Sequence, residues 1–141
     1  GYRYYDEKKV EPLFPLGHGL SYTSFAYAGL TASPETVNPA HAPPVSLQVT
    51  NTGKRAGHEI VQLYMRDIES RLKRPPRELK KFQKVFLEPG ETRTVSFTLD
   101  VEALSYWDPS VPGWVAEPGD FEVQVGASSR DIRAAALFTL A

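Results

Sequence analysis

The sequence predicts an all-β protein built as a two-layer β-sandwich, and three observations lead to that prediction. From residue 25 onward, apolar and polar residues alternate in short runs with a period of two, the pattern of half-buried strands. Pro-Gly and Asn-x-Gly turns separate these runs. The chain of 141 residues is long enough for one hydrophobic core and too short for two. Because each strand has one apolar face, two such faces must meet to exclude water.

The first half of the chain supplies three of the expected strands. Residues 25–30 form the first, and a loop with four prolines follows over residues 34–44. Residues 45–50 alternate cleanly between apolar and polar side chains and end at an Asn-Thr-Gly turn. Residues 59–65 are apolar on both faces. That composition is typical of a central strand more than of an edge strand.

The second half supplies four more strands, at residues 79–87, 95–99, 121–125 and 132–140. The first of these has the weakest alternation, and the next two each follow a Pro-Gly turn. Seven short strands in a chain of this length favour a seven-stranded sandwich of the immunoglobulin or fibronectin type III-like kind over a barrel.

An irregular N-terminal extension precedes the strands. We expect residues 1–22 to be the tail of a preceding domain and a connector, and residues 23–141 to be the sandwich. Within the stretch PLFPLGHGLSY (residues 12–22), two prolines and two glycines disfavour any regular element. Its apolar side chains nevertheless need a surface to lie against. The aromatic N-terminus is unlike a signal peptide. Gly1 in place of an initiator Met suggests a chain cut from a longer one.

Composition excludes several classes of function. The chain has no cysteine, which removes disulfides, thiolate metal sites and a cysteine nucleophile, and leaves the cellular compartment open. Its net charge of −1 and the absence of a long apolar run predict neither a nucleic-acid nor a membrane partner. His18, His41 and His58 lack the spacing of zinc ligands, and His41 is expected in a loop. We therefore expect no metal and no cofactor.

No catalytic residue is predicted in this chain. Sugar hydrolysis needs two carboxyl groups about 5 to 10 Å apart, one of them kept protonated by an apolar pocket. The close acidic pairs, Asp67 with Glu69 and Asp120 with Glu122, lie two residues apart on strands or in solvated turns. Ser21 is near His18 in sequence, but no Gly-x-Ser-x-Gly motif is present.

Two further segments suggest surfaces. Residues 71–81 contain six bases and one acid, which favours a solvated loop, with docking on an acidic neighbour and nucleic-acid binding as weaker alternatives. Tyr106, Trp107 and Trp114 lie around a Pro-Gly turn, where exposed rings could stack on a sugar. Since a sandwich of this size normally buries a tryptophan, we expect core or corner packing of these rings instead.

Six phrases, taken in order, resemble the C-terminal part of the glycoside hydrolase family three enzymes, chiefly β-glucosidases and β-xylosidases. They lie at residues 1–6, 12–23, 51–64, 74–82, 87–91 and 126–132. The resemblance implies a fibronectin type III-like sandwich attached to a retaining glycosidase. It also implies that the catalytic aspartate and glutamate belong to upstream domains. Leu16, where the family often has Phe, is a small departure.

The resemblance leads to a hypothesis for the N-terminal extension. Phe14, Leu16, His18, Leu20 and Tyr22 would dock on the catalytic domains of a parent enzyme. Arg74, from the basic segment, is the sixth docking candidate.

In the isolated chain, residues 1 to about 21 would be mobile, pair opportunistically or mediate self-association. The chain would then be a non-catalytic accessory module whose loop at residues 68–76 shapes the rim of the active site. The alternative is a module that binds carbohydrate or plant polymer through exposed aromatics.

Overall fold

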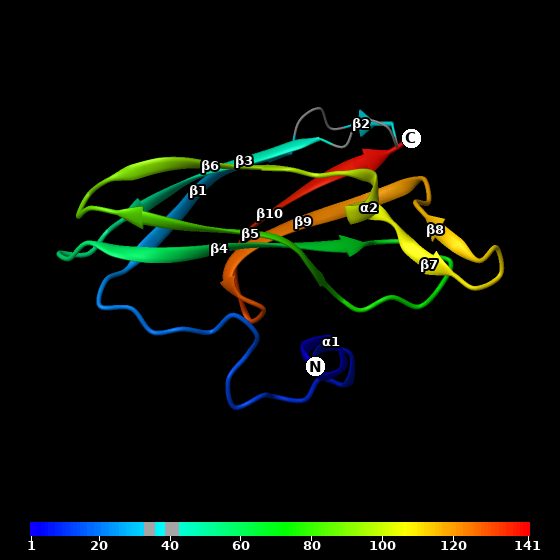
Figure 1. Cartoon of the computed structure of the whole chain (residues 1–141), viewed down its shortest axis with the longest axis horizontal. Helices are drawn as coiled ribbons and strands as arrows, with labels where there is room; N and C mark the ends of the chain where they lie inside the picture. Colours follow the sequence, from blue (N-terminus) through cyan, green and yellow to red (C-terminus); the bar gives the residue numbers. More distant parts are fainter. Residues whose placement is uncertain (33–35, 39–42) are drawn as a thin grey trace.

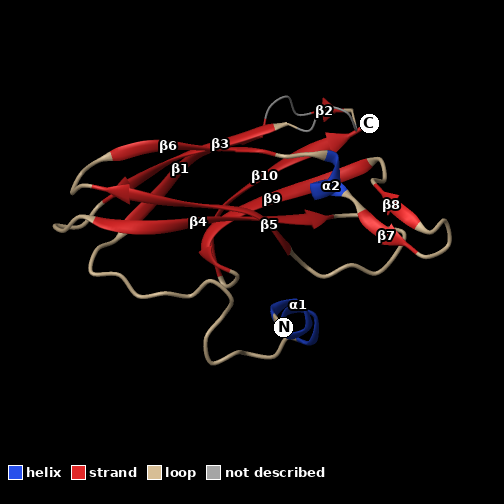
Figure 2. Ribbon diagram, viewed as in Figure 1, coloured by secondary structure: helices blue, strands red, loops and turns tan. Residues whose placement is uncertain are grey.

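The computed structural model describes residues 1–32, 36–38 and 43–141. The expected proline-rich loop and His41 lie largely or wholly outside these residues. Strands dominate the described chain, and only two short helices accompany them (Figure 2). The all-β prediction is therefore confirmed.

Two sheets form the layers of the sandwich. The first has the order β1-β3-β6 and consists of β1 (Phe25–Ala32), β3 (Pro44–Asn51) and β6 (Thr92–Thr98). The second has the order β2-β10-β9-β4-β5. Its members are β2 (Thr36–Val37), β10 (Asp131–Leu140), β9 (Gly119–Ser128), β4 (Gly57–Asp67) and β5 (Glu78–Leu87). Every pairing is antiparallel except β10 with β2.

The remaining elements are short. Helix α1 spans Tyr2–Lys8, helix α2 spans Val101–Leu104, and β7 (Tyr106–Asp108) pairs with β8 (Gly113–Val115) as a separate hairpin. All seven expected segments are strands, but the expected total of seven is too low, because β2, β7 and β8 bring the described strands to ten. These three have only two or three residues each, too few to show a period.

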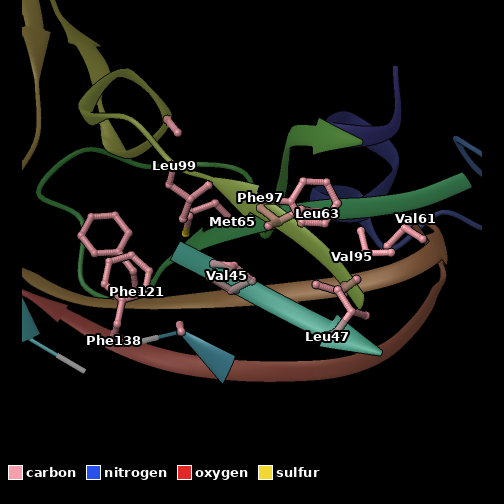
Figure 3. Packing of buried hydrophobic residues seen from close by; sticks show 14 of the residues in the cluster. Val45, Leu47, Val61, Leu63, Met65, Val95, Phe97, Leu99, Phe121 and Phe138 are labelled. Carbon is pink, nitrogen blue, oxygen red and sulfur yellow. The ribbon is translucent and has the colours of Figure 1, made fainter. Parts of the chain in front are cut away.

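The core lies between the two sheets, where the period-two faces meet. In β3 the alternation predicted from sequence is realised, because Val45, Leu47 and Val49 are fully buried and their neighbours are not. Figure 3 shows side chains of β3 and β6 packed towards those of β4, with Phe121 and Phe138 stacked at one end. The expected central strand is central: β4 lies between β9 and β5, and residues 61–65 are all buried.

The burial of β4 on both faces has a specific cause. Val61, Leu63 and Met65 join the core, whereas Gln62 and Tyr64 point to the outer face of the sheet. Figure 1 shows α1 and the segment after it on the side of β4 and β5 that faces away from β1, β3 and β6. The N-terminal residues therefore cover the outer face of the five-stranded sheet.

That arrangement corrects one part of the sequence analysis. The extension was expected to be irregular, yet residues 2–8 form a helix, which ends where Lys9 adopts a left-handed conformation. No residue of the helix is buried as a whole, and its N-terminus has no side-chain cap. A seven-residue helix of this kind is marginal on its own, so its contacts with the sheet must stabilise it. No helix in the described residues is long and apolar enough to cross a membrane.

Candidate docking surface and aromatic hairpin

Residues 1–22, hereafter the strap, contact the sandwich at two places, one in helix α1 and the other at Leu16. At the α1 end, the ring of Tyr2 meets that of Tyr64 edge-on at 6.1 Å, and the Tyr2 hydroxyl accepts a 2.7 Å hydrogen bond from the Leu79 amide. Further along, the Ser129 amide donates to the Leu16 carbonyl at 2.8 Å. Of the alternatives expected for the isolated chain, the structure shows pairing with its own sheet.

A buried carboxylate attaches α1. The side chain of Asp6 is 6% exposed and accepts a 2.8 Å hydrogen bond from Nε of Arg130. Arg77 lies 3.9 Å away on the other oxygen. Arg130 also donates to Glu11 and to the carbonyl of Val10. One arginine near the β9–β10 turn therefore holds both the helix and the segment that follows it.

Gly17 lies directly against the sheet. The side-chain Nε2 of Gln62 donates to the backbone carbonyl of Gly17 at 3.3 Å and to that of Ala127 at 2.8 Å. The side-chain Oε1 of Gln62 accepts a 2.6 Å hydrogen bond from the Tyr64 hydroxyl. A Cβ on Gly17 would collide with the side-chain amide of Gln62, and its φ of +78° is one that other residues rarely adopt, so the position favours glycine. Desolvation raises the pKa of Tyr64 to about 12, and the phenol stays a hydrogen-bond donor.

The other side of the strap is apolar and exposed. Leu13, Phe14, Leu20 and Tyr22 are between 70% and 96% exposed, and Leu16 is 39% exposed. His18 is also exposed and stacks on Phe14 with a centroid distance of 5.7 Å. A hollow of about 680 Å³ opens between α1 and Phe14, lined mainly by tyrosine, valine and leucine side chains of the strap. Large apolar side chains are therefore exposed along this side of the strap.

Arg74, the sixth expected docking residue, lies inside the domain instead. Its side chain is 8% exposed, and its guanidinium pairs with Asp67 at 3.0 Å and Glu78 at 3.2 Å. It also lies 5.5 Å from the centre of the Tyr106 ring. Its charge is therefore satisfied by β4, β5 and β7, and it fixes the loop at residues 68–76 to the sheet.

The two carboxylates beside Arg74 differ in their ionisation. Burial raises the pKa of Asp67, and the charge and hydrogen bond of Arg74 only partly oppose that rise. Burial would also raise the pKa of Glu78, but the hydrogen bond and charge of Lys80, followed by the charges of Arg74 and Arg3, bring it below its ordinary value. Lys80 Nζ is 2.8 Å from the Glu78 carboxylate.

The aromatic candidates separate into one buried and two exposed rings. Tyr106 is 8% exposed and donates its hydroxyl to Glu117 at 2.7 Å, so its ring is not free to stack on a ligand. Trp107 and Trp114 are 53% and 64% exposed. The expected core or corner packing of the tryptophans is wrong, because both lie on the outward face of the β7–β8 hairpin.

The other sequence candidates serve the fold. Asp67 is paired with Arg74, Asp120 accepts from Thr139 at 2.7 Å, and Ser21 accepts from the Thr23 amide at 3.2 Å. Across the parts of the chain that the structure describes, no group of three or more His, Asp or Glu side chains could hold a metal ion.

Sequence reasoning missed two arrangements. The first is helix α1, whose sequence carries no periodic signal. The helix is held by the ion pair between Asp6 and Arg130, which are far apart in sequence. The second is Arg71, which pairs with Asp108 and with Glu117 and so joins the loop at 68–76 to the hairpin. These partners lie 37 and 46 positions away in sequence, beyond any local pattern.

Comparison with known proteins identifies the domain. Residues 59–129 match the Fn3-like family, described as fibronectin type III-like domains. The chain belongs to this Fn3-like family. The match runs from β4 to the β9–β10 turn, and so includes the aromatic hairpin and the ion pairs of Arg71 and Arg74.

The Fn3-like chain is also similar to parts of larger enzymes. It is 52% identical over 132 residues to thermostable β-glucosidase B of Acetivibrio thermocellus, covering 94% of this chain and 18% of that protein. It is 51% identical over 138 residues to a β-glucosidase of Bacteroides ovatus, again covering 18% of that protein.

Among solved structures, a family three (GH3) β-glucosidase of Bifidobacterium adolescentis superposes with a TM-score of 0.93 at 41% identity. That superposition covers 99% of this chain and 20% of the other, so it includes the strap. The Fn3-like chain therefore spans about a fifth of the length of the proteins it matches.

Proposed function

We propose that this domain is a non-catalytic accessory module of a β-glucosidase-like retaining glycosidase, and that its strap docks on the catalytic domains of the parent. The observation that carries the proposal is the exposure of Phe14, Leu20 and Tyr22 on a strap whose other side is fixed to the sheet. The matched β-glucosidases are about five times longer than this chain, which supplies a large partner within the same protein.

The proposed role is stabilisation by apolar burial. Each square ångström of apolar surface removed from water contributes roughly 25 cal/mol before ordering costs are counted. The ordering cost is low here, because Gly17, Leu16 and Asp6 already fix the strap in one conformation. A strap held in advance loses little further entropy when its exposed face meets a partner.

The experiment compares two forms of the protein. We expect Phe14→Ser combined with Leu20→Ser to lower the Tm of the whole parent enzyme by several degrees. The same pair should leave the Tm of the isolated chain unchanged, because both side chains are already exposed in it. Leu137→Ser, on a leucine that is 59% exposed on β10, is the matched control. Equal effects on both forms, or no effect on the parent, would contradict docking through the strap.

A second part of the proposal concerns the loop at residues 68–76. Its base is fixed by Arg74 to β4 and β5, and its middle is fixed by Arg71 to the hairpin, which supports a loop of defined shape. We propose that it forms part of the rim of the parent's active-site cleft. Deleting the loop's exposed tip in the parent should change the ratio of kcat/KM for long and short glucosides. An unchanged ratio would remove the loop from the rim.

The proposal assigns no turnover to the isolated chain. Purified alone, it should not release the chromophore from an aryl β-glucoside. Measurable hydrolysis that persists after repurification would overturn the accessory role.

A further inference from the structure

The β7–β8 hairpin has two faces of opposite character. Trp107 and Trp114 are directly opposite each other in the pairing, with ring centroids 6.0 Å apart and planes at 80°. Both rings point away from the domain and are more than half exposed. On the other face, Tyr106 is 8% exposed and Asp108 is 1% exposed. The hairpin therefore presents its two largest apolar side chains to solvent and its polar ones to the protein.

The inner face fixes the hairpin in place. Asp108 accepts hydrogen bonds from the Ser110 amide at 2.8 Å and from the Ser110 hydroxyl at 2.6 Å, and it pairs with Arg71. Tyr106 donates to Glu117 immediately after the hairpin. A hairpin whose strands have only three residues each would otherwise be too short to hold its shape. Because its backbone is anchored in this way, the outward rings need little further ordering when a ligand binds.

A polar hollow lies beside Trp114. It has a volume of about 330 Å³, at the lower end of the roughly 300–1,000 Å³ typical of small-molecule sites. Its charged lining residues are Lys80 and Lys81 of β5, Asp100 at the N-cap of α2, and Glu102 of α2. Figure 1 shows α2 at the same end of the sandwich as the hairpin. The lining thus combines one aromatic ring with hydrogen-bond donors and acceptors.

The charges of this hollow indicate what it can bind. Asp100 and Glu102 bring carboxylates to it and Lys81 brings an ammonium group, with Lys81 Nζ 3.1 Å from Asp100, whereas the ammonium of Lys80 is paired with Glu78 at 2.8 Å. An anionic ligand would be repelled by the carboxylates of Asp100 and Glu102, and a cationic ligand by the ammonium group of Lys81. Neutral hydroxyl groups can both donate to the carboxylates and accept from the lysines. The lining therefore favours an uncharged polyhydroxylated ligand.

We propose that Trp114 and this hollow form a subsite for one pyranose unit of a neutral oligosaccharide, with Trp107 contacting the adjoining unit. The apolar face of the pyranose would stack on the Trp114 indole, while its hydroxyl groups bond to Lys81 and Glu102. This site is independent of the strap, because the hairpin and the docking surface involve different residues. Its failure would leave the docking proposal intact, and the reverse also holds.

The test titrates the whole chain with cellohexaose and with laminarihexaose, followed by NMR of the backbone amides and of the two indole N–H groups. We expect saturable shifts at both indoles and at residues 80–81 and 100–102. Trp114→Ala should weaken binding at least tenfold, Trp107→Ala less, and Trp114→Phe should restore part of the loss. Phe82→Ala is the matched control, since Phe82 is 65% exposed on the outer face of β5 and does not line the hollow.

Several outcomes would overturn the proposal. The first is the absence of saturable shifts with either hexasaccharide at millimolar concentration. A loss of affinity in Phe82→Ala equal to that in Trp114→Ala would indicate non-specific contact with exposed aromatics. Tighter binding of an oligogalacturonide than of cellohexaose would show an anion site built on the lysines. Because both tryptophans are exposed, their alanine variants should have the same Tm as the unmutated chain, and a thermal melt verifies this.

Discussion

At the scale of single residues, Asn51 is the most connected polar side chain in the core. It is fully buried at the end of β3. Its amide donates to the carbonyls of Arg55 and Leu87, and its oxygen accepts from the Thr23 hydroxyl and the Gly53 amide. One side chain thus joins Thr23, which directly follows the strap, to the turn after β3 and to the end of β5.

Replacing Asn51 should therefore be costly. We expect Asn51→Ala to lower the free energy of unfolding by about 3 kcal/mol, since it removes the partner of the buried Leu87 carbonyl and of the partly buried Gly53 amide. Thr52→Ala is the control, because that exposed residue bonds only at the surface. Urea denaturation of both variants measures the difference. A loss below about 1 kcal/mol in Asn51→Ala would show that water replaces the amide.

Glu78 gives a residue-scale prediction that depends on pH. Because its folded-state pKa is below the ordinary 4.5, its charged form stabilises the fold above that pH and the contribution is lost as the pH falls through the lowered value. Asp67 acts in the opposite sense, since burial raises its pKa.

We therefore expect Glu78→Gln to be less stable than the parent chain at pH 7. The difference should shrink between about pH 5 and pH 3. Urea midpoints measured at each pH, with the exposed Glu88→Gln as control, give the curve. A difference that stays constant over this range would exclude Glu78 as its source.

At the scale of elements, the strap is a separable unit, and Gly17 is the position that tests this. Gly17→Ala introduces a strained positive φ, which costs roughly 1–2 kcal/mol, and a clash with Gln62. We expect the strap to detach while the sandwich stays folded. Hydrogen exchange of residues 1–20 should become faster, with the amides of β3 and β9 unchanged.

The control for this variant is two residues away. Gly19→Ala has open space around its Cβ, so its exchange should match that of the parent chain. Equal acceleration in the two variants would mean that Gly17 has no special role. Faster exchange throughout the sandwich would mean that the strap and the core unfold together.

The elements also show how far sequence reasoning reaches. The alternation in β3, β6 and β9 is a local pattern, and each of these strands was predicted from it. Helix α1 was not predicted, because its stability comes from Asp6 and Arg130, which are 124 positions apart. The expected burial of the two tryptophans was wrong for the same reason. Which face of the β7–β8 hairpin is buried depends on the ion pair between Arg71 and Asp108. No local sequence pattern reveals that pair.

At the scale of the whole molecule, this domain has two surfaces that a stable monomer does not require. The strap and the aromatic hairpin lie on different elements, and both expose large apolar side chains over a fixed polar base. In a β-glucosidase-like parent, the first would meet the enzyme and the second would remain available to a sugar chain. The sandwich between them holds both surfaces in a fixed relation.

In the isolated chain the strap has no partner, and that leads to the last prediction. Exposed apolar side chains at this density favour association between copies. We expect the average mass in sedimentation equilibrium to rise with concentration, and the rise to disappear in Phe14→Ser combined with Leu20→Ser. Leu137→Ser should associate as the parent chain does, because its leucine stands alone on β10. If all three proteins stay monomeric at millimolar concentration, the strap surface is too weakly apolar to drive docking through burial alone. Specific polar contacts with the catalytic domains would then have to supply the remaining binding free energy.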